Sequence, residues 1–513
     1  MKLFLRRNAP LFYALAAMLA LYIPWLNRGY NNFEYPFVLA GRALAFSADA
    51  DLIDAYWPDI ANPLGYSFVL SLVYKVFGFS DSFWISRLPA LLGAVLVMIS
   101  GWIISNSIWS QKKNLFYIWA TLLIFQPMFV VFSTSGTTDL LPVGLLMLAV
   151  SLALGSQEKR FMLKIGIGLL FGIAVIIKYN TAYFGLALVA ASVYDSRVSK
   201  ASVRRKIRDV VPYIFVPGLI LCSYLYWCYE RYGIFISSRL ELSRPNYFDF
   251  SNLFKNFVKY LSFFGLLLAA LPLAVLFDES NRARLRISRS LCLTTIFAFV
   301  IGWYYSGFSV GELDFGRFFD SIDPVIRKVL ESLGAVLGLC AFLVMFRHIR
   351  SDSKLKTVLL CGILPYLILI SASYPSQRYL TFVLPGSLLL LVDAMQIFTR
   401  RTQTVLVSFS VAVFASVSLF GLSYLTSQGN ASEEMAVWVE ENNLISQTSA
   451  GVIKPHAGQH WWGIDADKTR YEIVAVTPSA EALVKERVLH REPMKVLGKV
   501  TRVYLLREIP VSP

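Results

Sequence analysis

Seven ionisable side chains lie at the ends of long apolar segments of this chain. They are Glu34, Asp139, Lys178, Glu312, Asp314, Arg317 and Arg378. Charged groups at membrane depth are costly, so those that are retained there are candidates for function. A carboxylate can accept a proton as a general base, and Lys or Arg can neutralise a phosphate. The simpler alternative, equally open at any one position, is that these residues cap helix ends or extend to the membrane surface.

The elements that position these residues are predicted to be membrane-spanning helices. The chain has 513 residues, of which 56% are hydrophobic and only 16% are charged, whereas soluble proteins carry about 25% charged residues. Apolar runs of this length predict membrane-spanning helices. Thirteen spans are predicted, at 11–26, 87–108, 115–133, 138–155, 161–177, 182–195, 210–228, 257–277, 289–306, 329–346, 357–373, 379–398 and 403–425. The first is interpreted as an uncleaved helix with a cytoplasmic start.

The distribution of charge predicts which side each loop faces. The net charge of +15 could suggest nucleic acid, but Lys and Arg cluster in short loops, as in the positive-inside pattern. With a cytoplasmic N-terminus, every cytoplasmic loop is basic and all seven candidate residues face outward. The outer loop 229–259 is an exception, with Arg231, Arg239, Arg244, Lys255 and Lys259. That excess suits an anionic partner, although a solvated basic loop is the more common explanation.

Two regions are predicted to lie outside the membrane. The first outer loop, 27–86, contains the apolar run Pro63–Gly78, which Lys75 interrupts and which is too short to span. We interpret this run, and Phe37–Phe46, as juxtamembrane helices. Residues 427–513 form a small α/β domain on the outer face, with a helix at 433–444 and strands at 450–454, 471–476 and 500–507. The predicted fold is therefore an all-α polytopic membrane domain, residues 1–426, followed by this small domain.

Several short motifs occur in a characteristic order along the first 400 residues. They are Phe33-Glu34 with Ala40-Gly41-Arg42, Asn62-Pro63-Leu64-Gly65-Tyr66, Arg87-Leu88-Pro89, Thr138-Asp139-Leu140, Gly168–Tyr179 and Arg378-Tyr379. In this order they resemble the GT-C class of integral membrane glycosyltransferases. The resemblance is nearest to the bacterial protein-mannosyltransferase and aminoarabinose-transferase group.

The resemblance implies an enzyme that moves a sugar from a polyprenyl-phosphate donor to a lipid, glycan or protein acceptor. It implies inversion at the sugar, at the outer face of the bacterial plasma membrane. Glu34 or Asp139 would be the general base. The residues that would contact the donor phosphate are Arg378, Lys178, Arg317 and Tyr66. No cofactor, metal ligand or nucleic-acid partner is predicted, and dependence on a divalent cation stays open.

Two departures from the family pattern keep other functions open. Phe33 stands where the family has its catalytic Asp, and Ala61 stands where some members have a Lys that contacts the donor phosphate. A catalytically inactive relative of the family is therefore one alternative. A secondary transporter or flippase is another, although the chain lacks the inverted repeat that is typical of many transporters.

Overall fold

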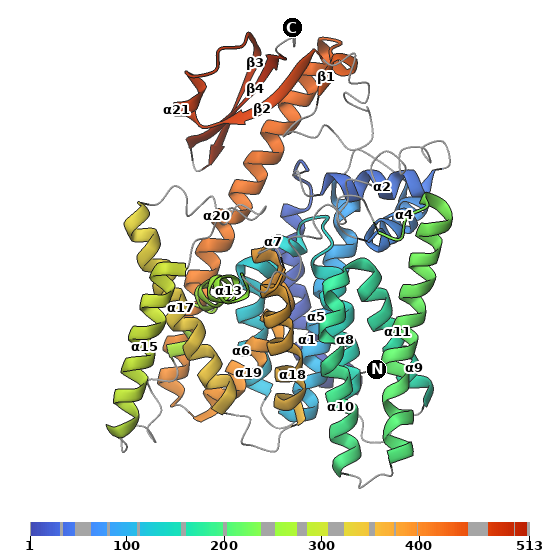
Figure 1. Cartoon of the computed structure of the whole chain (residues 1–513), viewed down its shortest axis with the longest axis vertical. Coiled ribbons are helices and arrows are strands. Elements are labelled where there is room, and N and C mark those ends of the chain that lie inside the picture. The colour runs from blue at the N-terminus through green and yellow to red at the C-terminus, as the bar shows by residue number, and fades with distance from the viewer. Residues whose placement is uncertain are drawn as a thin grey trace.

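Helices account for most of the computed structural model of this chain (Figure 1). The structure describes residues 2–30, 34–46, 63–78, 83–109, 113–154, 161–198, 203–236, 252–273, 285–305, 323–347, 354–373, 376–397, 399–449, 470–496 and 498–509. The α-helices of the bundle are α1 (Lys2–Tyr22), α2 (Tyr35–Ala45), α4 (Gly65–Phe77), α5 (Phe83–Ile108), α6 (Lys113–Phe125), α7 (Pro127–Ser133), α8 (Leu140–Leu154), α9 (Phe161–Ile177), α10 (Gly185–Val198), α11 (Val203–Tyr232), α13 (Leu253–Leu267), α15 (Leu285–Tyr305), α17 (Pro324–Arg347), α18 (Lys354–Ser371), α19 (Leu384–Ala394) and α20 (Arg400–Glu441). The 3-10 helices η1 (Ile23–Trp25), η4 (Tyr179–Phe184), η8 (Gln377–Phe382), η9 (Met395–Ile397) and η10 (Ile445–Gln447) connect or extend them.

The described helices make this a multi-pass membrane protein, but the predicted number of thirteen spans is not confirmed. Six helices within the described residues are long and apolar enough to cross a membrane, or seven if a bent pair counts as one span. The bent pair corrects the predicted span 115–133, which is two helices, α6 and α7, at an angle of 66°. Pro127 has no N–H to continue α6, and the side chain of Gln126 caps α7 by accepting from Phe129 N.

The two predicted juxtamembrane helices are confirmed as helices α2 and α4. They pack on each other, and Ser67 Oγ donates a hydrogen bond to Phe37 O. The buried face of α4 includes Tyr66, Leu70 and Tyr74. Figure 1 shows α2 and α4 at the same end of the bundle as the C-terminal sheet, with the N-terminus toward the opposite end. The membrane side that this end of the molecule faces stays a prediction from loop charge.

The central helices approach one another closely where glycine replaces a larger residue. On α5, a Cβ at Gly93 would lie 2.5 Å from Leu140 O on α8. On α8, a Cβ at Gly144 would lie 2.4 Å from Gly93 O. Only residues without a side chain allow this separation, and small residues serve the same purpose in many membrane helix pairs. The α5–α8 contact places Arg87, near the start of α5, and Asp139, directly before α8, in one region of the molecule.

A small four-stranded sheet follows α20, which runs without a break through two predicted elements. The predicted span 403–425 and the predicted helix 433–444 belong to this one helix, and the proposed domain boundary at 427 falls inside it. The sheet has the order β1-β2-β4-β3, with β1 (Thr448–Ser449), β2 (Tyr471–Val476), β3 (Val488–Val496) and β4 (Lys499–Glu508). The short helix α21 (Pro478–Glu481) lies between β2 and β3.

Two of the predicted strands are confirmed as β2 and β4, which pair antiparallel from Tyr471–Glu508 to Val476–Val503. The predicted strand 450–454 lies outside the described residues. Sequence reasoning missed β3, which contains Pro493. Proline lacks the N–H for a ladder hydrogen bond and is therefore confined to edges and bulges. This explains the error, because β3 is one of the two edge strands of the sheet.

Candidate functional site

Glu34 is held in a buried ion pair with Arg87, the first residue of the predicted second span. Arg87 Nε lies 2.7 Å from Glu34 Oε1, and Arg87 Nη2 lies 2.9 Å from Oε2. Glu34 Oε1 also accepts a hydrogen bond of 2.5 Å from Gly136 N. Both side chains are completely buried. Because both carboxylate oxygens accept hydrogen bonds, this arrangement suits a structural anchor better than a proton acceptor.

Arg87 also holds the chain segment that leaves α1. Its Nη1 donates to Leu26 O at 2.6 Å and to Arg28 O at 2.7 Å, and Nη2 donates to Gly29 O at 3.0 Å. The planar guanidinium presents five N–H donors in a fixed geometry, which allows one side chain to make all these contacts. The sequence signal for this role was an arginine within the apolar helix α5. Arg87 was quoted as part of a motif but was not predicted as a site residue.

Arg28 connects the same segment to the loop before α8. Its Nη1 donates to Thr134 O at 2.6 Å and to Trp25 O at 2.8 Å, and its Nη2 donates to Ser135 Oγ at 2.8 Å. Burial, reinforced by repulsion from Arg87, lowers the pKa of Arg28 to about 9, although Glu34 acts in the opposite direction. The residue remains a cation at neutral pH. Arg28 and Glu34 together hold the 134–139 loop, which ends at Asp139.

Asp139 and Lys178 form a second buried ion pair through Asp139 Oδ1 and Lys178 Nζ. Asp139 directly precedes α8, and Lys178 directly follows α9. The other oxygen, Asp139 Oδ2, is buried without a hydrogen-bond partner. A buried carboxylate oxygen without a donor is costly, so such an atom requires an explanation. Proton transfer from a substrate hydroxyl would use this oxygen.

The late Arg-Tyr motif meets this second ion pair. Lys178 Nζ lies 5.1 Å from the centre of the Tyr379 ring and 5.5 Å from that of Phe382, both on η8. Arg378 is half-buried, and its guanidinium carbon lies 5.9 Å from the centre of the Tyr379 ring. These distances are typical of cation–π contacts. The structure therefore brings Asp139, Lys178 and Arg378, which the sequence placed only on the same side of the membrane, into one neighbourhood.

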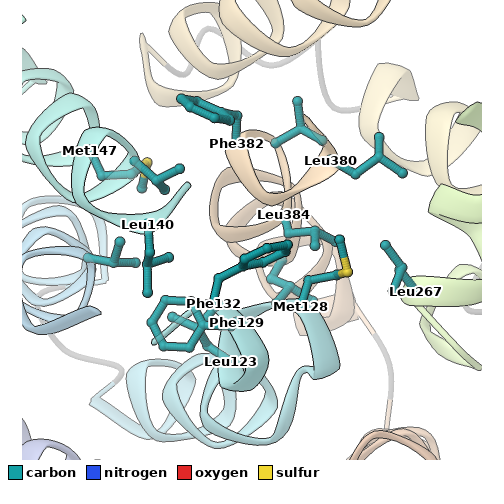
Figure 2. Close-up of a cluster of buried hydrophobic side chains, with 14 of the residues drawn as sticks. Leu123, Met128, Phe129, Phe132, Leu140, Met147, Leu267, Leu380, Phe382 and Leu384 are labelled. Carbon is teal, nitrogen blue, oxygen red and sulfur yellow. The ribbon is translucent and has the colours of Figure 1, made fainter. Parts of the chain in front are cut away.

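A buried apolar cluster supports this neighbourhood. Figure 2 shows Leu140, which follows Asp139, together with Leu380 and Phe382 from η8. Side chains from α6, α7, α8, α13 and α19 complete the cluster: Leu123, Met128, Phe129, Phe132, Met147, Leu267 and Leu384. Protein cores are close-packed, so side chains attached to such a cluster are held in place.

Tyr66 lies close to Arg87, within the packed interface between α4 and α5. It is fully buried, and its hydroxyl donates a weak hydrogen bond of 3.4 Å to Ser86 O. It lies close enough to Glu34, Arg87 and Asp139 to interact with their charges. Its predicted role at the donor phosphate stays a prediction. The remaining candidates Arg317, Glu312 and Asp314 lie outside the described residues, as do Phe33 and Ala61.

No His, Cys, Asp or Glu side chains cluster in threes as metal ligands within the part of the chain described. The described site thus consists of two ion pairs, Glu34–Arg87 and Asp139–Lys178, joined by the 134–139 loop and bordered by Arg378. In this site, carboxylates lie beside fixed cations at the ends of apolar helices.

Residues 61–227 match the dolichyl-phosphate-mannose-protein mannosyltransferase family. This match confirms the resemblance to GT-C membrane glycosyltransferases that the order of motifs indicated. The matched range contains Tyr66, Arg87, Asp139 and Lys178 of the site. Glu34 lies before it, and Arg378 lies after it.

Two crystal structures of ArnT from Cupriavidus metallidurans are also similar to this chain. One is bound to undecaprenyl phosphate and the other is in the apo state. Both are 15% identical in sequence and align over 98% of their own chain. The bound form covers 97% of the present chain with a TM-score of 0.46, and the apo form covers 98% with a TM-score of 0.45. No curated protein matches the chain.

Proposed function

We propose that this protein transfers a sugar from a polyprenyl-phosphate donor to an acceptor at the outer face of the bacterial plasma membrane. The observation that carries the proposal is the buried Asp139–Lys178 pair, whose Oδ2 has no hydrogen-bond partner. This pair lies inside the range that matches a family named for a lipid-phosphate-linked sugar donor. Loop charge supports the outward orientation of the site.

The reaction requires one base and at least one cation. The acceptor oxygen attacks the anomeric carbon of the donor sugar, and the bond from that carbon to the phosphate oxygen breaks. The acceptor proton passes to Asp139 Oδ2, and polyprenyl phosphate leaves with the bonding electron pair. Because the acceptor attacks directly, opposite the leaving group, the configuration of the anomeric carbon is inverted.

Lys178 and Arg378 stabilise the leaving phosphate in this mechanism. Lys178 is paired with Asp139 before the reaction. When Asp139 accepts the proton, its negative charge disappears, and the charge of Lys178 becomes available to the phosphate. The cation therefore acts where negative charge develops, which is the most effective place for electrostatic stabilisation. Arg378 contributes a guanidinium whose paired donors match two phosphate oxygens.

Glu34 takes a positioning role in this proposal, instead of the role of base expected for it. Arg87 and Gly136 N already occupy both of its oxygens. Through Gly136 it holds the loop that ends at Asp139. Asp139 is completely buried, so the mechanism also requires the surrounding segments to open before an acceptor can reach Oδ2.

The decisive experiment is transfer by purified Asp139→Asn from a polyprenyl-phosphate sugar donor. Loss of general-base catalysis lowers rates by about 10²–10⁴-fold, and we expect a loss in this range. The matched control is Asp209→Asn, because Asp209 forms a similar ion pair with Lys164 between α9 and α11. Full activity in Asp139→Asn would refute the assignment of Asp139 as base. Donor binding without turnover in the parent protein would favour an inactive relative, and substrate counterflow in proteoliposomes without transfer would favour a transporter.

A further inference from the structure

The basic outer segment 229–259 ends in two lysines, Lys255 and Lys259, on helix α13. Lys255 and Lys259 lie one turn apart on α13, and the first turn of this helix contains no acidic residue. Within the described part of the chain, neither amine forms a hydrogen bond or ion pair. Like charges at this spacing destabilise a helix. Two neighbouring amines of this kind are suited to bind an anion.

Helix α17 brings two further cations to the same place. Lys259 interacts electrostatically with Lys255, Lys328 and Glu331. The carboxylate of Glu331 is fully buried, with Arg327 Nε at 3.1 Å and Lys328 Nζ at 4.0 Å. The negative charge of Glu331 is therefore already paired with cations of its own helix, α17. The two lysines of α13 lie beside this cluster, Lys255 exposed and Lys259 half-buried.

Close packing fixes the two helices that carry these cations. A Cβ at Gly265 of α13 would lie 2.0 Å from Gly334 O and 2.3 Å from Gly338 N, both on α17. Figure 1 shows α13 nearly end-on beside α17, so the two helices cross instead of running in parallel. A crossing with backbone contact leaves little freedom for one helix to slide along the other. The cationic surface is consequently preorganised, which lowers the entropic cost of binding.

Exposed aromatic side chains border this cationic surface. Phe254 is 53% exposed, and its ring packs edge-on against Tyr305, at 5.6 Å between ring centres. Tyr304 is 76% exposed, and Trp303 accepts a hydrogen bond from Lys328 Nζ through its carbonyl oxygen. Tyr and Trp are enriched at the level of lipid headgroups. Their presence points to a ligand at the membrane surface and not to a soluble anion.

We propose that Lys255 and Lys259, together with Arg327 and Lys328, bind the phosphate of an anionic phospholipid headgroup. This surface, defined by these four residues, is separate from the Asp139–Lys178 pair. The binding proposal stands independently of the proposed transferase reaction.

The adjacent, buried face of α13 contacts the segment that leads to Arg378. Asn256 Nδ2 donates to Ser371 O at 3.1 Å and to Ser373 O at 3.3 Å. Tyr260 Oη accepts from Ser376 N at 2.9 Å. Asn256 and Tyr260 directly follow the two lysines in sequence, so one helix connects the lipid surface with the site. The consequence for function rests on the proposed transferase: bound anionic lipid would increase the rate of transfer.

The test is native mass spectrometry of the full chain with phosphatidylglycerol or phosphatidylcholine, without donor or acceptor. We expect phosphatidylglycerol to bind more tightly. Each basic residue near an anionic surface contributes roughly fivefold in affinity, so Lys255→Gln/Lys259→Gln should bind about 30-fold more weakly. The matched control is Lys485→Gln/Lys499→Gln, which removes two exposed lysines of the C-terminal domain and should bind like the parent protein.

Three outcomes would overturn the lipid assignment. One is equal binding of the two phospholipids, and another is unchanged binding of phosphatidylglycerol to the Lys255/Lys259 variant. The third is displacement of the lipid by inorganic phosphate at millimolar concentration, which would assign the surface to a soluble anion. A thermal unfolding curve like that of the parent protein confirms that the variant is folded. Because no transfer is measured, failure of the transferase proposal leaves this result unaffected.

Discussion

Replacing Arg87 tests whether the Glu34–Arg87 pair anchors the site. In Arg87→Met, Glu34 keeps the hydrogen bond from Gly136 N but loses its cation, and three backbone carbonyls lose a donor. Removing one partner of a buried ion pair costs about 3–5 kcal/mol. Each buried acceptor left unsatisfied costs about 1–3 kcal/mol. We therefore expect destabilisation of at least about 5 kcal/mol, which is large compared with typical protein stabilities.

The milder substitution Arg87→Lys keeps the positive charge but removes the planar arrangement of N–H donors. Lysine has three donors and arginine has five, so Arg87→Lys loses at least two of the five hydrogen bonds that Arg87 makes. At about 1–3 kcal/mol for each unsatisfied acceptor, the expected loss is about 2–6 kcal/mol. The measurement is unfolding of the purified protein in detergent, followed by tryptophan fluorescence.

A double-mutant cycle separates the ion pair from its surroundings. If Glu34 and Arg87 stabilise the fold as a pair, Glu34→Gln/Arg87→Met should cost less than the sum of the single changes. Each single change leaves one charge of the pair buried without the other, whereas the double change removes both charges. Additive effects, or single changes that cost less than about 1 kcal/mol, would refute the reasoning. The cycle also tests the role of Glu34. Loss of transfer in Glu34→Gln with unfolding unchanged would identify Glu34 as the base.

Two further predictions concern α20 and the C-terminal sheet. Gly429→Ala places a Cβ 2.5 Å from Gly29 O, beside the carbonyls that Arg87 holds, so we expect a lower unfolding temperature and slower transfer; parent-like values of both would contradict the contact. Burial, together with a hydrogen bond to and repulsion by Glu434, raises the pKa of Glu492 from its usual value of 4.5 to about 7. The folded state therefore favours protonated Glu492, so its contribution to stability is complete below pH about 4.5 and is lost as the pH rises through about 7. Hydrogen exchange in the sheet should therefore increase over this pH range in the parent protein, but much less in Glu492→Gln. The neighbouring His490, whose pKa is lowered by burial, is present in both proteins and affects both equally. Equal increases in the two proteins would contradict the prediction.

The helical character of the chain followed directly from its sequence, but the number of spans did not. Long apolar runs predict helices because every backbone polar group in a membrane must be satisfied within the segment. The same runs do not reveal where a helix bends, as α6 and α7 do at Gln126. Nor did they reveal that α20 continues through a polar stretch. Burial of Ala431 and Met435 in α20 is a tertiary contact.

The candidate site shows the same division. Asp139, Lys178 and Arg378 were predicted as site residues because charges at the ends of apolar helices are costly. A charged residue next to an apolar run can be recognised from the local sequence alone. Their proximity depends on packing between α8, α9 and η8. The central place of Arg87 was not predicted, because its value depends on carbonyl groups of the segment after α1 that only the fold brings within reach.

By itself, the sequence determined the membrane class of this protein, its family resemblance and most of the residues that carry charge to the site. These properties depend on composition and on the order of short motifs along the chain. The tertiary structure decided which charges are paired. It joined Glu34 with Arg87 and Asp139 with Lys178, and it left Asp139 Oδ2 without a hydrogen-bond partner. Pairing depends on the tertiary structure because a buried charge requires a partner within a few ångströms, and the two residues can be far apart in the chain.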